Sequence, residues 1–318
     1  MVDVVLNIFA KPYQTALSAL SLLRFCDRHI GRFFLQFEPS GSRYDSVPPY
    51  AIAAYLGQRA VITQPDIWIE CDAADPARLD DPAYRLALRY QSGFEFTDKR
   101  YLFVMHNDVL IKTDVIGAML ESIGDAIAIG HIGQCWNCPA SREALVREAG
   151  VSDHPCTPAT FADFFLTPEQ LARLYAVGKE RGFPVRPYWE GWQTHYAENA
   201  WPLPECRVNE WACLVDVERT RPHVRPHGPI MPFGGYEACG SVSLDIDVAW
   251  FRDLHRLGFR ARHFDLKRHV RHFIGSHRMT RNLHMQAETE ARELLEKHFP
   301  EFVTWCRAHN KGKKGMFE

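Results

Sequence analysis

The chain has 318 residues, of which 46% are hydrophobic and 24% are charged, a composition typical of globular proteins. Its net charge of −2 excludes a general attraction to nucleic acid. The most apolar stretches, residues 17–25 and 115–130, are interrupted by charges or glycine, so we expect no transmembrane segment, and any membrane contact would be peripheral. The first residues show no signal-peptide pattern, which favours a cytoplasmic location.

Apolar strands alternate with helical patterns over the first 130 residues. Pro12 suits the first turn of a helix that follows the first strand. Strands that alternate with helices indicate an α/β fold with a largely parallel sheet. We predict strands over residues 2–9, 33–37, 60–63, 67–69, 101–105 and 126–129, and helices over 84–90 and 115–122.

The pattern changes between residues 131 and 210, which are rich in cysteine, tryptophan, proline and arginine. Thr167 and Gln170 frame a helix start with the spacing of a capping box. The strand pattern resumes over 211–217, a helix is predicted over 246–257, and a last helix follows residue 283. We therefore divide the chain into residues 1–130, an insertion at 131–210, a second sheet-forming part at 211–282, and a C-terminal helix and tail at 283–318.

Polar residues that directly follow buried strands are the first candidates for a site, because open α/β sheets bind ligands at the carboxyl ends of their strands. Asp108 follows the strand at 101–105 and can hold a divalent cation or cap a turn. Asp245 and Asp247 open a predicted helix, where one of them can act as a general base or only as a cap. His263, His269, His272 and His277 can add metal ligands or lie on the surface.

Two further patterns leave their interpretation open. Residues 219–281 hold twelve Lys/Arg against five Asp/Glu, which fits either a solvated basic face or a site for a diphosphate. Aromatic residues crowd the segment 188–211, either as a sugar-binding surface or as the small core of the insertion.

Nine cysteines in a chain without an export pattern favour thiols or metal ligands over disulfides. Cys135 and Cys138 form a Cys-x-x-Cys pair, and thiols downstream can complete a tetrahedral zinc site. A redox pair or buried reduced cysteines are the alternatives. The zinc hypothesis uses Cys135, Cys138, Cys156 and Cys206.

The order of these motifs resembles glycosyltransferase family 2 on the GT-A fold. The resemblance covers roughly residues 2–130 and 207–280. His106 stands where the first acid of the family's metal motif is expected, and Leu244 stands where a glutamate is expected before Asp245. The motifs that carry the resemblance are Asn7 near the end of the first strand, Glu38 before Pro39-Ser40, His106-Asn107-Asp108, Gly234-Gly235-Tyr236, Asp245-Ile246-Asp247 and His272-Phe273-Ile274-Gly275-Ser276.

The resemblance implies an inverting glycosyltransferase that moves a sugar from a nucleotide-diphosphate donor to a hydroxyl acceptor such as a cell-surface glycan. Residues 1–130 would be the nucleotide-sugar-binding half, and 211–282 the acceptor and catalytic half. It implies Mn²⁺ or Mg²⁺ on Asp108 and His272, Asp245 as the base with Asp247 in reserve, and donor contacts from Asn7, Glu38, Asn107, Asp108 and Arg271. Two alternatives stay open: a catalytically decayed module that binds carbohydrate or a partner, and a nucleotidyltransferase.

Overall fold

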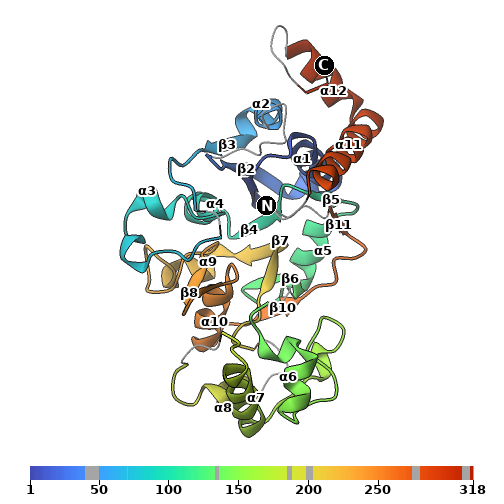
Figure 1. Cartoon of the computed structure of the whole chain (residues 1–318). Helices are drawn as coiled ribbons and strands as arrows, with labels where there is room; N and C mark the ends of the chain where they lie inside the picture. The colour runs from blue at the N-terminus through green and yellow to red at the C-terminus, as the bar shows by residue number, and fades with distance from the viewer. Residues whose placement is uncertain are drawn as a thin grey trace.

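A seven-stranded sheet with the strand order β10-β6-β7-β4-β1-β2-β3 forms the centre of the molecule (Figure 1). The computed structural model describes residues 1–39, 50–69, 71–132, 136–184, 188–197, 203–273, 280–309 and 316–317. The strands are β1 (Val2–Ile8), β2 (Ile30–Phe37), β3 (Ala60–Thr63), β4 (Tyr101–His106), β6 (Ala128–Ile132), β7 (Val208–Asp216) and β10 (Ala261–His263). Within this sheet β7 runs antiparallel to both of its neighbours, and the other adjacent strands are parallel. The predicted α/β fold with a mixed, mostly parallel sheet is confirmed.

Helices cover both faces of the sheet, which explains why its central strands β1 and β4 are mostly apolar. In β1, Val4 and Leu6 pack into the core on one face, and Val5 packs into the core on the other. The first core includes residues of α1 (Pro12–Cys26), α5 (Val115–Ser122), α11 (Arg281–His298) and α12 (Pro300–His309). The second includes residues of α4 (Gln91–Phe96) and α10 (Val248–Arg256).

The insertion forms a separate lobe beside the sheet, at the end of the molecule opposite α12 (Figure 1). It holds α6 (Glu143–Glu148), α7 (Pro168–Glu180) and α8 (Trp192–Ala197) around a hydrophobic core of its own. The predicted capping box at Thr167 and Gln170 is present at the start of α7. Aromatic residues of the segment that begins at Tyr188 pack in or against this core. The boundary that we drew at residue 210 falls within β7.

One side of the insertion is joined to α10 by a histidine pair. His195 Nε2 lies 2.7 Å from His255 Nδ1, and the ring of Tyr196 stacks on His255 with centroids 4.8 Å apart. His255 is 2% exposed. This contact therefore buries an imidazole between the insertion and the main sheet.

Two small antiparallel sheets and several short helices complete the chain. The pairing of β5 (Val109–Ile111) with β11 (Val270–His272) brings the late part of the chain beside the end of β4. The second small sheet pairs β8 (Glu237–Cys239) with β9 (Val242–Leu244). The short helices are α2 (Ala51–Leu56), α3 (Pro82–Arg85), α9 (Val217–Thr220) and the 3-10 turns η1 (Asp27–His29), η2 (Gly57–Arg59), η3 (Pro76–Arg78), η4 (Pro139–Ser141), η5 (Phe161–Asp163) and η6 (Arg221–His223).

Three local predictions are wrong. The helix predicted over 84–90 ends early, because α3 stops at Arg85, whose guanidinium binds the Leu79 carbonyl and Glu95. No strand forms over 67–69. The helix predicted over 246–257 begins at Val248, because Asp247 adopts a left-handed backbone conformation with φ 66°.

In the part of the chain that the structure describes, no helix combines the length and the apolarity that crossing a membrane requires.

Candidate functional site

A pocket of about 110 Å³ opens where the parallel strands β1, β2 and β4 reach their carboxyl ends. Side chains from these strand ends and from the segments that follow them surround it, as expected for an open α/β sheet. The lining residues are Asn7, Phe9, Lys11, Glu38, Trp68, Arg89, Tyr90, His106, Asn107 and Asp108. Four of the predicted site residues, Asn7, Glu38, Asn107 and Asp108, are among them.

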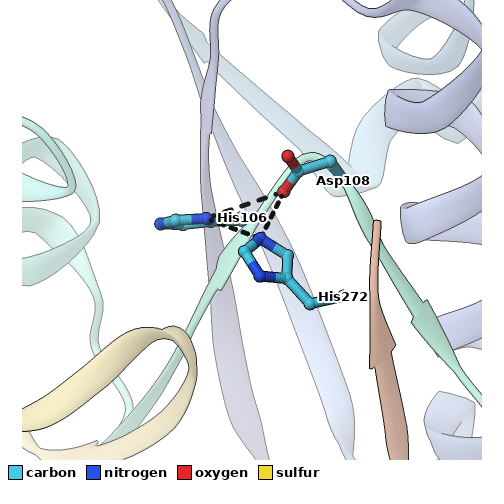
Figure 2. A group of neighbouring side chains, drawn as sticks. All are labelled: His106, Asp108 and His272. Atoms are coloured by element: carbon cyan, nitrogen blue, oxygen red, sulfur yellow. Dashed lines mark hydrogen bonds and ion pairs between the residues drawn. The ribbon is translucent and has the colours of Figure 1, made fainter. Parts of the chain in front are cut away.

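Two imidazoles and a carboxylate meet at one end of this pocket (Figure 2). His106 ends β4, Asp108 lies in the turn between β4 and β5, and His272 ends β11. His272 Nε2 lies 3.0 Å from Asp108 Oδ1, His106 Nδ1 lies 3.6 Å from the same oxygen, and the two ring nitrogens are 3.3 Å apart. The antiparallel pairing of β5 with β11 places His272 there, together with a hydrogen bond from Phe273 N to the Asp108 carbonyl.

The spacing of these three atoms fits a single metal ion. Two ligands that each lie about 2.1 Å from an ion, at angles of 90–110°, are separated by about 3.0–3.4 Å. Two of the observed separations, 3.0 and 3.3 Å, fall within this range, and the third, 3.6 Å, is slightly longer. Within the part of the chain that the structure describes, His106, Asp108 and His272 are the group of three metal-binding side chains close enough to share an ion. The predicted metal residues Asp108 and His272 are thus brought together, and His106 joins them.

Lys11 closes the other side of Asp108. Ala10 and Lys11 both have φ 57°, a left-handed turn that costs about 1 kcal/mol or more for each non-glycine residue. The turn directs Lys11 Nζ to within 2.7 Å of Asp108 Oδ2. Burial would raise the pKa of the Asp108 carboxyl, but the Lys11 ammonium and the two imidazoles hold it well below its usual value. Asp108 is therefore ionised.

Asn107 supports this turn from inside. Its Nδ2 donates to Thr15 Oγ1 at 2.9 Å and to the Ala10 carbonyl at 3.2 Å. Asn107 thereby holds the backbone that carries Lys11, instead of presenting its amide to the pocket.

Glu38 lies at the opposite end of the pocket among hydrogen-bond donors. It accepts from Asn7 Nδ2, from Trp68 Nε1 at 2.9 Å and from Arg89 Nε at 3.2 Å. The rings of Trp68 and Phe9 are nearly parallel, with an angle of 7° and centroids 6.3 Å apart. This end therefore combines a fixed carboxylate with flat apolar surfaces, a combination suited to a planar polar ring.

A chain of charged side chains runs from His106 to Asp245. His106 Nε2 lies 3.3 Å from Glu210 Oε1, and the buried Arg207 pairs with Glu210 and, at 2.7 Å, with Asp245 Oδ2. Burial would lower the pKa of His106, but its contacts with Asp108 and Glu210 raise it. Burial would raise the pKa of Glu210, but Arg207 and His106 lower it. Glu210 is therefore ionised and accepts hydrogen bonds only.

The two predicted catalytic acids differ in their surroundings. Asp245 is partly exposed and accepts a hydrogen bond from its neighbour Ile246 N, while its own N–H donates to Asn137 Oδ1 of the insertion at 3.0 Å. Asp247 is fully buried, with Oδ1 accepting from Gly234 N. Burial, followed by the nearby Glu210 charge, raises the pKa of Asp247 well above its usual value. Asp245 is therefore the acid of the pair that a ligand can reach.

The remaining predicted residues lie apart from the pocket lining. Arg271 is exposed and binds Glu290 of α11 at 2.6 Å. His263 Nδ1 accepts from Ile132 N, and His269 pairs with Thr113. His277 lies outside the described residues.

The four-thiolate zinc site stays a prediction. Cys135 lies outside the described residues, and Cys138, Cys156 and Cys206 are buried in the core of the insertion. These three described thiols do not form a group of metal-binding side chains close enough to share an ion.

Several residues of the site were not predicted. Lys11, Trp68 and Arg89 line the pocket, and Arg207 and Glu210 link it to Asp245. Glu210 gives one usable signal of a buried, paired acid in the sequence, because it stands near the start of a mostly apolar strand. Such a residue is rarely buried unless it is paired.

The fold and the site together define an α/β protein with a charged pocket at the carboxyl edge of a mostly parallel sheet. No protein-family model matches the chain, and no curated protein sequence is similar to it.

The chain is similar to solved structures of glycosyltransferases. For a mannosyltransferase from Pyrobaculum calidifontis in complex with GDP-Man and Mn²⁺, the identity is 9% and the TM-score is 0.45. The match covers 98% of this chain and 65% of that one. For glucosyl-3-phosphoglycerate synthase from Mycobacterium tuberculosis, in complex with Mn²⁺, UDP and phosphoglyceric acid, the identity is 10% and the TM-score is 0.42. The match covers 93% of this chain and 78% of that one.

For the galactosyltransferase LgtC, in complex with donor and acceptor sugar analogues, the identity is 16% and the TM-score 0.29, with 48% of this chain covered. The chain spans about half the length of LgtC. At these identities and TM-scores, the similarity to solved structures does not extend to substrate or activity.

Proposed function

We propose that the protein is an inverting, metal-dependent glycosyltransferase, which moves a sugar from a nucleotide-diphosphate donor to a hydroxyl acceptor such as a cell-surface glycan. The observation that carries the proposal is the pocket, which has a three-ligand cluster at one end and an acid beside two aromatic rings at the other. A nucleoside diphosphate has the matching parts, a polyanion and a planar base. The proposal includes Mn²⁺ or Mg²⁺ as the ion and a cytoplasmic location.

The residues of the pocket have distinct roles in this proposal. Glu38 accepts hydrogen bonds from the base, and Phe9 and Trp68 pack against its ring. His106, Asp108 and His272 hold the ion, which neutralises charge on the leaving diphosphate when bound. The ammonium of Lys11, 2.7 Å from Asp108, supplies a second positive charge beside the phosphates.

Asp245 accepts the proton of the attacking hydroxyl in this proposal. Its carboxylate is paired with Arg207, which fixes its orientation, and it is the more exposed of the two acids. A general base must lie within hydrogen-bond reach of the hydroxyl, and partial exposure leaves room for an acceptor. The contact between Asn137 and the backbone of Asp245 places the insertion beside the same acid, where it can contribute to acceptor binding.

The test is a binding and hydrolysis screen. We expect UDP or GDP and their sugars to bind in the presence of a divalent ion, EDTA to abolish this binding, and the donor sugar to be hydrolysed slowly. Asp108→Asn should remove the ion-dependent binding. Asp114→Asn is the matched control, because Asp114 also pairs with a histidine, His29, at 3.0 Å but lies outside the pocket.

The outcomes separate the alternatives. Nucleotide-sugar binding without hydrolysis or transfer would favour the decayed binding module. A nucleoside-diphosphate affinity that neither EDTA nor Asp108→Asn changes would refute the metal role. Release of pyrophosphate from a nucleoside triphosphate and a sugar phosphate would favour a nucleotidyltransferase.

A further inference from the structure

The chemistry of the three ligand atoms narrows the choice of ion. The cluster offers two imidazole nitrogens and one carboxylate oxygen, His106 Nδ1, His272 Nε2 and Asp108 Oδ1. Mg²⁺ prefers oxygen ligands in near-ideal octahedral geometry, whereas imidazole suits first-row transition ions. A site with one protein oxygen among three ligands therefore fits Mg²⁺ poorly.

We propose that this site selects a first-row transition-metal dication over Mg²⁺, and that Glu210 is the positioning residue that presents His106 to the ion. The inference rests on the proposed function only for the role of the ion in holding a diphosphate. The selection itself follows from the ligand atoms of His106, Asp108 and His272.

Glu210 determines which nitrogen of His106 faces the ion. The Nδ1 atom lies toward His272 and Asp108, and the Nε2 atom lies 3.3 Å from Glu210. Glu210 is paired with Arg207 and accepts hydrogen bonds, so the Nε2 atom that faces it is the nitrogen of His106 that donates. The Nδ1 lone pair is then free for a metal, the arrangement in which a carboxylate orients a metal-binding histidine. Arg207 holds Glu210 in place from the other side.

The other two ligands are also held from behind. The ring of His272 stacks on Trp211, with centroids 5.3 Å apart and an angle of 6°. Lys11 binds Oδ2 of Asp108, which leaves Oδ1 as the oxygen that points into the cluster. Each ligand atom is therefore oriented before an ion arrives, and Asp108 offers one oxygen instead of two.

The experiment measures metal binding directly. Metal-stripped protein is titrated calorimetrically with Mn²⁺, Co²⁺, Zn²⁺ and Mg²⁺, with and without a nucleoside diphosphate, and Co²⁺ binding is also followed by its visible absorption. A double variant, His106→Ala with His272→Ala, supplies the baseline for ions bound elsewhere, including at the insertion thiols. We expect Co²⁺ to bind at least ~10²-fold more tightly than Mg²⁺.

Two single variants separate the ligand from its positioning residue. His106→Asp should raise Mg²⁺ affinity and reduce the preference for Co²⁺ at least ~10-fold, because it replaces nitrogen by oxygen. Glu210→Gln should lower Co²⁺ affinity ~10–100-fold and shift the Co²⁺ absorption, and Glu210→Asp should restore part of both. His29→Gln, which alters a histidine–carboxylate pair outside the pocket, should change neither. Circular dichroism confirms that each variant is folded.

The results distinguish this inference from the proposed function. Mg²⁺ affinity within tenfold of Co²⁺ affinity, or an unchanged preference in His106→Asp, would overturn the metal selection. An unchanged Co²⁺ spectrum and affinity in Glu210→Gln would overturn the positioning role. If Co²⁺ binds as expected but no nucleoside diphosphate binds with it, the metal selection stands and the glycosyltransferase proposal fails. If Mg²⁺ supports nucleotide binding as well as Co²⁺ does, the glycosyltransferase proposal stands and the metal selection fails.

Discussion

The histidine pair between the insertion and α10 should make the protein less stable in mild acid. Burial, the positive charge of Arg260 and the neighbouring His195 lower the pKa of His255 from 6.5 to about 3. In the unfolded chain the same imidazole takes up a proton near pH 6.5, whereas in the folded protein it stays neutral until about pH 3. The unfolded state therefore binds more protons throughout this window, and the free energy of unfolding falls as the pH falls through it.

The size of the effect follows from the two pKa values. At pH 5 the unfolded imidazole is about 1.5 pH units below its pKa, which corresponds to about 2 kcal/mol at 1.36 kcal/mol per unit. At pH 8 neither state is protonated, so the contribution is close to zero. Between pH 8 and pH 5, the wild type should therefore lose about 2 kcal/mol more of its free energy of unfolding than His255→Gln, which cannot titrate.

Urea unfolding at the two pH values measures this difference. His154→Gln is the control, because His154 is exposed in the insertion and should leave the pH dependence of the wild type unchanged. The reasoning would be refuted if wild type and His255→Gln lost the same stability within about 0.5 kcal/mol.

Three further results are expected. Asp245→Asn should reduce transfer ~10²–10⁴-fold with donor binding nearly intact, and a parallel loss of donor affinity would show that Asp245 holds the donor instead. Gly234→Ala should cost at least about 3 kcal/mol in chemical unfolding, because the new Cβ would lie 1.8 Å from the Arg89 carbonyl oxygen. Gly182→Ala, with a similar positive φ and no atom within 4 Å, should cost only about 1 kcal/mol. Freshly prepared protein should carry about one zinc per chain that Cys138→Ser removes, and zinc-free wild type would reject the insertion site.

The sheet was predictable where a strand is buried on both faces. The mostly apolar runs of β1 and β4 stand out in the sequence, and both strands are buried over most of their length. The antiparallel direction of β7 was not predictable, because an apolar run has the same composition in either direction. The helix expected over 84–90 failed because the backbone after Arg85 continues in tighter turns, in which Leu88 N donates to the Arg85 carbonyl, and because Tyr90 adopts φ 63°.

The candidate site was predictable only in part. Asp108 and Asp245 follow strand-like runs, which marks them in the sequence. Their relation to each other depends on His106, Glu210 and Arg207, whose contacts arise from the register of β4 with β7 and cannot be read from spacing. The replacement of an acid by His106 looks like a loss in the sequence, whereas in the structure His106 is part of the ligand cluster.

The reversed direction of β7 has a consequence for how this molecule can diverge. β6 is parallel to β4 and β7 is antiparallel to both, so β6 ends and β7 begins at the same edge of the sheet, the edge that holds the pocket. Both ends of the insertion therefore lie on that edge, and the insertion can change in length or sequence without breaking a strand pair. During evolution this lobe can be replaced as a unit. Such a replacement would alter the protein surface beside Asp245, while Glu38, Asp108 and Lys11 keep their places.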